Sequence, residues 1–242
     1  MSSSNKGSSL FFLFLITLLN LFSGCIALVY ASQENFEMAF FFVCLGIFFD
    51  FFDGFFARLF NVSSPLGLQL DSLADMVTSG VVPGFVMFKM LSNAVDSDPS
   101  LTYLPYFGFI ITLGSCYRLA NFNIDTRQSD SFIGVPTPTN AMFVASFYPI
   151  LNAYEGIEMI ENILLNDYFL IGYCLIMSYL LISELPLIAL KFKTFAINEN
   201  LYRYILIGGA VVLGIAFQYL AIPMVLVLYI LLSVIQTLAH NK

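Results

Sequence analysis

A membrane-embedded acidic centre is indicated by nine consecutive residues, Asp50-Phe51-Phe52-Asp53-Gly54-Phe55-Phe56-Ala57-Arg58. Two further carboxylates, Asp71 and Asp75, follow after a short turn, so four acidic side chains fall within a strongly apolar region. An ionised side chain inside a membrane is costly and needs a partner or a function. Four carboxylates together repel one another unless a cation neutralises them. The sequence therefore predicts a metal site here.

The composition is that of a polytopic membrane protein. Of the 242 residues, 59% are hydrophobic and only 10% are charged, whereas roughly 45–50% of a soluble domain is apolar. The single histidine, His240, lies next to the end of the sequence, and the four cysteines are widely spaced. These features argue against zinc binding and histidine-based catalysis. We expect an all-α fold, a bundle of transmembrane helices.

About eight transmembrane helices are expected, because a helix needs roughly 20 apolar residues to cross a bilayer. The apolar stretches cover residues 9–30, 36–60, 68–92, 103–121, 138–153, 167–190, 201–217 and 219–238. Six or seven spans is the alternative. Residues 1–9 are polar and are expected to be disordered in the cytoplasm. We expect residues 10–242 to form one transmembrane domain that contains the motif at 50–75.

Charged residues are segregated between the two sides of this arrangement. With the N-terminus inside, the inner segments hold Lys6, Arg58, Arg118, Arg127, Lys191, Lys193, Arg203 and Lys242. The outer segments hold Glu34, Glu37, Asp96, Asp98, Glu155, Glu158, Glu161 and Asp167. Basic residues favour the cytoplasmic side of a membrane. The pattern therefore predicts a cytoplasmic-membrane protein with its acidic centre facing the cytoplasm.

The spacing of the carboxylates predicts how they meet. Asp50 and Asp53 are three residues apart, and Asp71 and Asp75 are four apart, so each pair shares one face of a helix. The intervening turn brings the two pairs to one depth. Hard oxygen ligands of this kind suit Mg²⁺ or Mn²⁺, and a close pair of such ions suits phosphoryl transfer.

Two alternative roles for four buried carboxylates are less well supported. One arginine, Arg58, cannot balance four aspartates, which disfavours a purely structural set of ion pairs. A divalent-cation transporter is chemically reasonable. Its acidic residues would be expected near the middle of the bilayer, whereas these lie toward one face.

Small and polar residues surround the carboxylates. Gly54 leaves room for a ligand or helix beside Asp53, and Ala57 continues the small face. Arg58 offers a planar, permanently charged group suited to phosphate. Ser64 adds a hydroxyl in the turn, and Gly67 opens the third span.

The whole pattern resembles the signature of the CDP-alcohol phosphotransferases. It has the form Asp-x2-Asp-Gly-x2-Ala-Arg-x8-Gly-x3-Asp-x3-Asp, without departure in identity or spacing. The resemblance implies a six-helix catalytic core, two divalent cations (Mg²⁺ or Mn²⁺), and CMP as leaving group. It implies that Asp50, Asp53 and Asp71 bind metal, with Asp75 beside the ions as a further ligand and as general base. The implied CDP-binding residues are Gly54, Ala57, Arg58, Ser64 and Gly67.

Three other segments resemble the integral-membrane phosphatidylserine synthases of bacteria and archaea. They are residues 16–24, 114–123 and 132–138, read as Ile-Thr-Leu-Leu-Asn-Leu-Phe-Ser-Gly, Gly-Ser-Cys-Tyr-Arg-Leu-Ala-Asn-Phe-Asn and Phe-Ile-Gly-Val-Pro-Thr-Pro. Asn121 stands where that group has a second arginine. The resemblance implies CDP-diacylglycerol and L-serine as substrates, and phosphatidylserine as product.

Candidate acceptor residues follow from charge and from the same resemblance. Arg118 could hold a carboxylate or a lipid phosphate, and Asn123 and Lys191 could assist it. The alternative role is membrane topology for Arg118 and Lys191 and a loop turn for Asn123. Asn20, within the first span, could touch the nucleotide or bond another helix. Because inner cations are numerous, glycerol 3-phosphate or inositol phosphate remains the alternative acceptor. Membrane lipid is an expected partner, nucleic acid is not, and a homodimer is consistent with the family.

Overall fold

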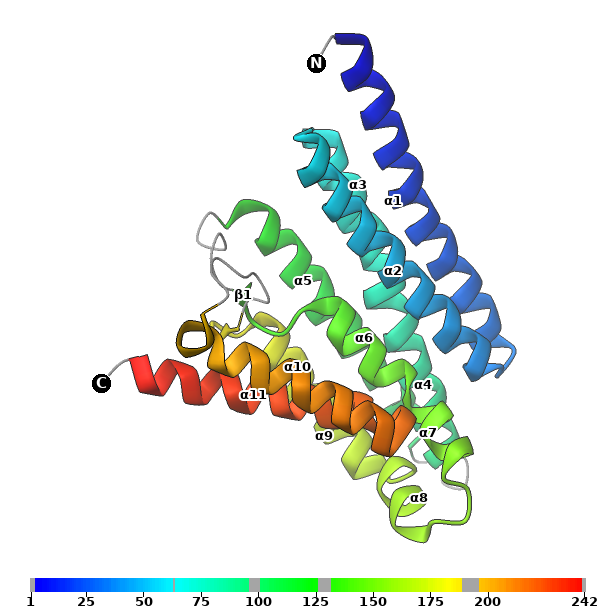
Figure 1. Cartoon of the computed structure of the whole chain (residues 1–242). Helices are drawn as coiled ribbons and strands as arrows, with labels where there is room; N and C mark the ends of the chain where they lie inside the picture. Colours follow the sequence, from blue (N-terminus) through cyan, green and yellow to red (C-terminus); the bar gives the residue numbers. More distant parts are fainter. Residues whose placement is uncertain (1–2, 63, 96–100, 126–131, 189–195, 241–242) are drawn as a thin grey trace.

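The computed structural model describes residues 3–62, 64–95, 101–125, 132–188 and 196–240. The described chain is a bundle of α-helices, drawn in Figure 1. The strands in these ranges are two residues long: β1 (Phe132–Ile133) pairs antiparallel with β2 (Pro186–Leu187). The predicted all-α class is therefore confirmed.

The first half of the bundle consists of α1 (Ser3–Ser32), α2 (Phe36–Phe60), α3 (Pro65–Asp75), the π-helical segment η1 (Met76–Val81), α4 (Val82–Val95), the 3₁₀ segment η3 (Leu104–Phe109) and α5 (Ile110–Ile124). The second half consists of α6 (Thr137–Ala145), α7 (Phe147–Ala153), α8 (Glu158–Leu164), α9 (Asp167–Ile182), α10 (Ile197–Phe217), the 3₁₀ segment η4 (Gln218–Leu220) and α11 (Ala221–His240). Helix α1 begins within residues 1–9, for which the sequence predicts disorder.

Several helices are long and apolar enough to span a membrane. In the described ranges these are Gly7–Ser32, Phe36–Phe60, Pro65–Ala94 and the 40-residue segment Asn200–Ala239, with a fifth if the bent pair α8 and α9 forms one span. The 40-residue segment reverses at η4, so that α10 and α11 lie side by side (Figure 1). The chain is thus a membrane helix bundle, but helix length and composition do not establish the predicted count of eight spans.

Two of the predicted spans are interrupted for local reasons. The stretch 138–153 breaks between α6 and α7, because Pro149 cannot accommodate the helical carbonyl of Ala145 four residues earlier. The stretch 167–190 is helical only to Ile182. Ser183 is extended there, and Pro186 begins the short strand β2.

A short turn reverses the chain between α2 and α3, just beyond the aspartates of α2. Helix α2 ends at Asn61, whose left-handed backbone (φ 51°) lets its N–H bond to carbonyls of the last turn. Ser64 then caps α3, its hydroxyl accepting a hydrogen bond from the amide of Gly67 at 2.9 Å. Pro65 occupies the first turn of α3, where no amide hydrogen is required. The end of the bundle formed by this turn is called the motif end below.

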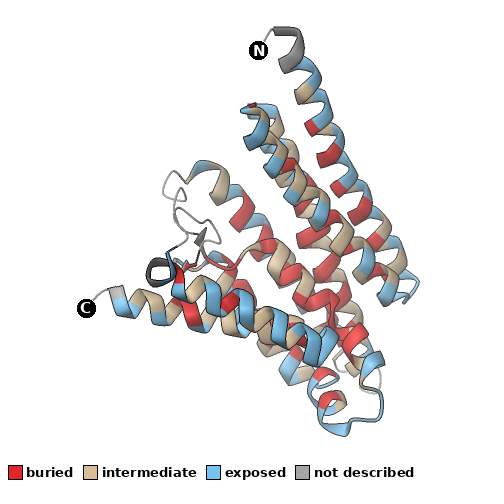
Figure 2. Cartoon of the chain, in the orientation of Figure 1, coloured by how far each residue is buried: buried red, intermediate tan, exposed pale blue. Residues whose placement is uncertain are grey.

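The core runs along one face of α1. Leu13, Thr17, Asn20, Ala27 and Ala31 are buried at helical spacing, while the opposite face is exposed (Figure 2). This face packs on α2, α3 and η1. By contrast, little of the α10–α11 hairpin is buried. Exposed apolar side chains of this kind are expected where helices meet lipid.

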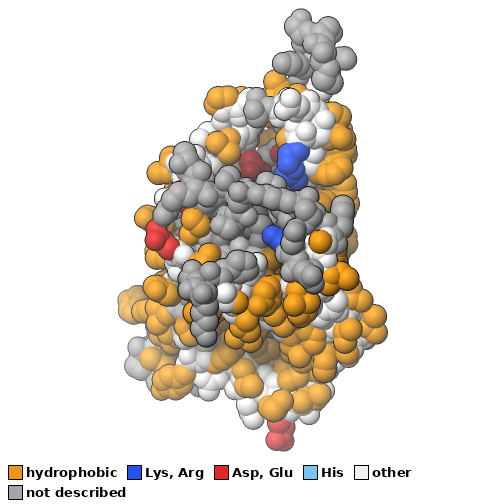
Figure 3. Space-filling view, turned by 60° about the vertical axis from the view of Figure 1, so that its left-hand side comes forward, with side chains coloured by type: hydrophobic (Ala, Val, Ile, Leu, Met, Phe, Trp, Pro, Cys, Tyr) orange, Lys and Arg blue, Asp and Glu red, His pale blue; other side chains and the backbone are white. Residues whose placement is uncertain are grey.

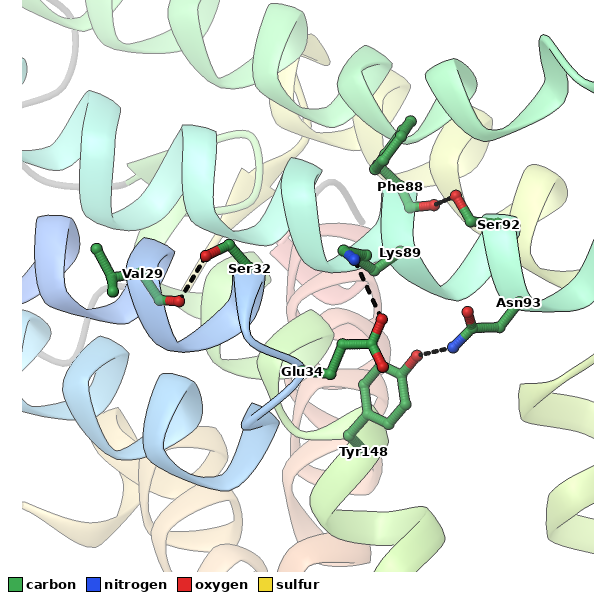
Figure 4. Close-up of polar contacts among 8 residues, drawn as sticks. All are labelled: Val29, Ser32, Glu34, Phe88, Lys89, Ser92, Asn93 and Tyr148. Atoms are coloured by element: carbon green, nitrogen blue, oxygen red, sulfur yellow. Dashed lines mark hydrogen bonds and ion pairs between the residues drawn. The ribbon is translucent and has the colours of Figure 1, made fainter.

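The opposite end of the bundle carries a polar group that we call the far-end cluster, formed by Glu34, Lys89, Asn93 and Tyr148 (Figure 4). Lys89 Nζ lies 3.1 Å from Glu34 Oε1, and Asn93 Nδ2 donates to Tyr148 Oη at 2.9 Å. The ring of Tyr148 stacks on Phe36 with centroids 3.5 Å apart. These contacts join the α1–α2 turn to α4 and α7.

Candidate active site

The structure brings the four aspartates together from two helices. Asp50 and Asp53 come from α2, and Asp71 and Asp75 from α3. Asp53 and Asp75 are buried, and the other two are half-buried. The carboxylates of Asp50 and Asp71 approach closely enough to share a hydrogen bond, and Asp53 and Asp75 also act electrostatically on Asp50. We call these four residues the acidic centre. Its mutual repulsion must be offset by protons or cations.

Helix α1 supplies two polar side chains to this centre. The hydroxyl of Thr17 donates to Asp53 Oδ2, and Asn20 Nδ2 donates to Asp75 Oδ1 at 3.0 Å. The Thr17 hydroxyl also lies 3.1 Å from the carbonyl of Leu13, so its single proton serves one acceptor at a time. Thr17 was not among the residues predicted from the sequence. The sequence could have indicated it, because Thr17 and Asn20 are polar residues three positions apart in an apolar span.

The four carboxylates have the chemistry of a divalent-cation site, but their side chains are not yet arranged around one point. Carboxylate oxygens are the ligands that Mg²⁺ and Mn²⁺ prefer. However, within the described ranges no three acidic, cysteine or histidine side chains already converge on a point that one ion could occupy. The hydrogen bonds to α1 explain this, since Thr17 and Asn20 hold Asp53 and Asp75 toward α1 while Asp50 and Asp71 face each other.

Arg118 is a buried cation beside the acidic centre. It is buried on α5 and lies close enough to Asp75 and to Tyr229 of α11 to interact electrostatically with both. Its Nε has no hydrogen-bond partner among the described residues. A buried guanidinium with a free donor is costly unless a ligand, water or ion completes it. Arg118 is therefore placed to receive an anionic group beside Asp75.

Asn123 lies at the same end of α5. Its Oδ1 accepts a hydrogen bond from the Ser72 hydroxyl at 3.0 Å, which ties α5 to α3 next to Asp71. Lys191, the third predicted acceptor residue, lies outside the described residues.

The CDP-binding residues predicted from the motif lie on α2, in the turn that follows it and in the first turn of α3. Gly54 directly follows Asp53 and Ala57 lies one turn beyond it; both are half-buried, and Arg58 is exposed. Ser64 acts as the cap of α3, as described above. Gly67 is crowded, because a Cβ there would lie 3.1 Å from Ser64 Oγ and 3.3 Å from the ring of Phe14. Its lack of a side chain therefore lets α1 approach the start of α3.

One face of the molecule combines charged and apolar side chains. Figure 3 shows acidic side chains set back behind a basic side chain, with hydrophobic side chains over much of the described surface of this face. Charged groups on a largely apolar surface suit a molecule that has both a polar head and lipid chains.

Comparison with known proteins identifies the arrangement. The family model of the CDP-alcohol phosphatidyltransferases matches residues 14–173, which include α1, the acidic centre and Arg118. The chain belongs to this family. The match extends the resemblance beyond the motif, and it favours a phosphotransferase over the transporter considered above.

Individual members of the family show similarity over much of their length. A CDP-diacylglycerol–serine O-phosphatidyltransferase of Helicobacter pylori is 32% identical over 198 residues, covering 80% of this chain and 77% of the relative. The enzyme of the same name from Bacillus subtilis is 35% identical over 147 residues, covering 57% of this chain and 78% of the relative. An archaetidylserine synthase of Methanothermobacter thermautotrophicus is 31% identical over 137 residues, covering 55% and 56% of the two chains.

Proposed function

We propose that the chain transfers the phosphatidyl group of CDP-diacylglycerol to the hydroxyl of L-serine, giving phosphatidylserine and CMP. The observation that carries this proposal is similarity to relatives that bear this name, together with the complete family motif on α2 and α3. The convergence of Asp50, Asp53, Asp71 and Asp75 in the fold supports it. The enzyme would be a CDP-diacylglycerol–serine O-phosphatidyltransferase.

Two divalent cations are part of the proposal, and Asp50, Asp53, Asp71 and Asp75 would hold them. The family generally uses such cations, and they would neutralise the pyrophosphate and orient the attack. Because Thr17 and Asn20 occupy an oxygen each on Asp53 and Asp75, ligand geometry in the loaded enzyme depends on these α1 contacts.

The chemical step is a direct displacement. Asp75 accepts the proton of the serine hydroxyl, whose oxygen forms a bond to the β-phosphorus of CDP-diacylglycerol. The bond from that phosphorus to the oxygen of CMP breaks, and CMP leaves. Burial of Asp75 and its hydrogen bond from Asn20 support this role, because a general base must be held in one orientation.

Separate groups would bind the donor and the acceptor. Gly54, Ala57, Arg58, Ser64, Gly67 and Asn20 are the proposed CDP-binding residues. Arg118 would hold the serine carboxylate or the lipid phosphate, which its position beside Asp75 and its free Nε favour. Asn123, tied to Ser72, and Lys191 would complete the acceptor side.

The proposed membrane arrangement keeps the lipid chains in the bilayer. Residues 10–242 would form one catalytic domain with about eight crossings, its acidic centre facing the cytoplasm. The charge distribution of the sequence supports this orientation. CDP-diacylglycerol would enter sideways from the inner leaflet, and serine from the cytoplasm. A homodimer is the proposed assembly, by analogy with the family alone.

The decisive experiment measures CMP release from the purified chain in detergent, with CDP-diacylglycerol and Mn²⁺ or Mg²⁺. L-Serine, glycerol 3-phosphate and inositol phosphate are compared as acceptors, and the lipid product is identified. Serine-dependent release with phosphatidylserine as product is expected. Release with a phosphorylated alcohol alone would retain the family chemistry and discard serine as acceptor. No release with any acceptor would overturn the proposal.

A further inference from the structure

A chain of hydrogen bonds links Thr78 to Asp75 through Asn20 of α1. Asn20 Nδ2 donates to Asp75 Oδ1 at 3.0 Å, and Thr78 Oγ1 donates to the backbone carbonyl of Asn20 at 3.1 Å. Thr78 lies three residues after Asp75, in the π-helical segment η1. The two bonds therefore close a loop in which η1 holds the residue of α1 that in turn holds Asp75.

Two glycines make this loop sterically feasible. A Cβ at Gly24 of α1 would lie 2.9 Å from the Cα of Thr78, a backbone clash that only a shift of the helices could relieve. A Cβ at Gly46 of α2 would lie 2.7 Å from Thr78 Cγ2 and 2.9 Å from Asn20 Oδ1. Thr78 thus packs closely against both helices, and the lack of a side chain at Gly46 leaves room for the amide of Asn20.

Gly24 also exposes the acceptor that Thr78 uses. In an α-helix the carbonyl of residue i accepts from the amide of residue i+4, so the carbonyl of Asn20 belongs to the amide of Gly24. A side chain at position 24 would cover that carbonyl. Its absence leaves the second lone pair of the oxygen open to the hydroxyl of Thr78.

The π-helical segment aligns Thr78 with this acceptor. The amide of Val82 bonds to the carbonyl of Val77 five residues earlier, which widens the helix immediately after Asp75. Such π-turns add a residue to a helix and are frequent at functional sites. All of Thr78, Ser79 and Gly80 are buried here, so the irregular segment is enclosed by packing and held in one conformation.

We propose that Thr78 is a positioning residue for the reaction, which acts through Asn20 to fix the orientation of the Asp75 carboxylate. This inference rests on the proposed function, because it requires Asp75 to act on the acceptor hydroxyl. It assigns to Asn20 a role in orienting Asp75, and to Gly24 and Gly46 the role of admitting Thr78. Thr78 itself touches no substrate.

The test compares two isosteric changes on the same segment. Thr78→Val removes the hydroxyl but keeps the methyl group between the glycines. The control, Thr112→Val, removes a hydroxyl from α5 that donates to the carbonyl of Gly80 at 2.9 Å, also in η1, with no link to Asn20 or Asp75. Loss of a group that orients a ligand from outside typically costs about 10- to 100-fold. We expect Thr78→Val to lower kcat about tenfold with KM for serine and CDP-diacylglycerol within about twofold, and Thr112→Val to match the unaltered protein.

Two further variants separate positioning from packing. Thr78→Ser restores the hydroxyl without the methyl and is expected to recover most of kcat, even where it lowers the thermal midpoint. In a double-mutant cycle, Thr78→Val combined with Asn20→Leu is expected to lose no more kcat than Asn20→Leu alone, because both act through one bond to Asp75.

Equal kcat in Thr78→Val and Thr112→Val would overturn the inference, as would losses in the double variant that multiply independently. Failure of Thr78→Ser to recover activity would also contradict it. These outcomes differ from failure of the proposed function, which appears as absence of serine-dependent CMP release in the unaltered protein. The comparison is made only once that release has been measured.

Discussion

The two ends of the bundle differ in whether their polar side chains are paired. In the far-end cluster, Lys89 pairs with Glu34 and Asn93 with Tyr148, so each group has a partner of matching chemistry. In the acidic centre, four carboxylates gather beside the guanidinium of Arg118, whose Nε lacks a partner among the described residues. Satisfied polar groups hold helices together, whereas an excess of one charge is stable only if something else binds.

The two ends also differ in what they contribute to stability and to catalysis. Contacts at the far end lie partly in solvent, and exposed pairs of this kind are worth at most about 1 kcal/mol. The acidic centre is largely enclosed, where a charge exerts a stronger effect on its neighbours. Changes at the motif end should therefore alter catalysis, and changes at the far end should alter stability slightly.

The largest effect is expected from Asp75→Asn. This variant keeps the shape of the side chain and removes its ability to accept a proton, which should lower the rate by about 10²–10⁴-fold while largely sparing binding of CDP-diacylglycerol. CMP release measures the first effect, and equilibrium binding of the lipid measures the second. The matched control is Glu37→Gln on α2, whose carboxylate accepts from Asn152 at 3.2 Å near the far end. A near-normal rate for Asp75→Asn would show that Asp75 is not the general base.

Arg118→Lys should have the next largest effect. Lysine retains the charge but loses the planar donor group, so KM for serine should rise about 10-fold, the equivalent of one charged hydrogen bond. Initial rates over a range of serine concentrations provide the measurement. Arg203→Lys on α10 serves as control, because Arg203 donates to Asn200 on its own helix. If KM for CDP-diacylglycerol rises instead, Arg118 binds the lipid phosphate and the acceptor lies elsewhere.

An effect of similar size, on the metal requirement alone, is expected from Thr17→Val, which removes the hydroxyl that donates to Asp53. Because this bond orients a proposed metal ligand, we expect about a 10-fold higher Mn²⁺ concentration for half-maximal rate. Titration of the rate with Mn²⁺ measures it. Ser92→Ala on α4 is the control, since that hydroxyl donates to the carbonyl of Phe88 in its own helix. An unchanged Mn²⁺ requirement would show that the Thr17 hydroxyl does not affect metal binding.

The smallest effect on catalysis should come from Tyr148→Phe at the far end. The change removes the hydrogen bond from Asn93 and keeps the stacking on Phe36, so the free energy of unfolding should fall by about 1 kcal/mol with kcat unchanged. The thermal midpoint in detergent and the rate of CMP release are measured together. A loss of kcat of about tenfold, as expected for Thr78→Val, would contradict the division between the two ends.

Much of the fold and of the site follows from local sequence. The spans at 9–30, 36–60 and 68–92 agree with Gly7–Ser32, Phe36–Phe60 and Pro65–Ala94, because continuous apolar stretches of this length form helices in a membrane. The breaks at Ser146 and Ser183 were missed. Hydropathy is insensitive to Pro149 and Pro186, which interrupt helices without making them less apolar.

The sequence by itself determined where the four aspartates lie along the chain and which of them share a helix face. Helical spacing places Asp50 with Asp53 and Asp71 with Asp75, and a short turn obliges the two pairs to face each other. These are consequences of local geometry, which depends on residues a few positions apart.

Only the tertiary structure decided which groups on α1 complete the centre. Thr17 meets Asp53 across 36 positions, and Asn20 meets Asp75 across 55. Such contacts depend on how far each helix is rotated and how closely its axis approaches its neighbours. Gly24 sets that approach through direct contact with Thr78, and close packing at one small residue cannot be inferred from the periodicity of any single helix.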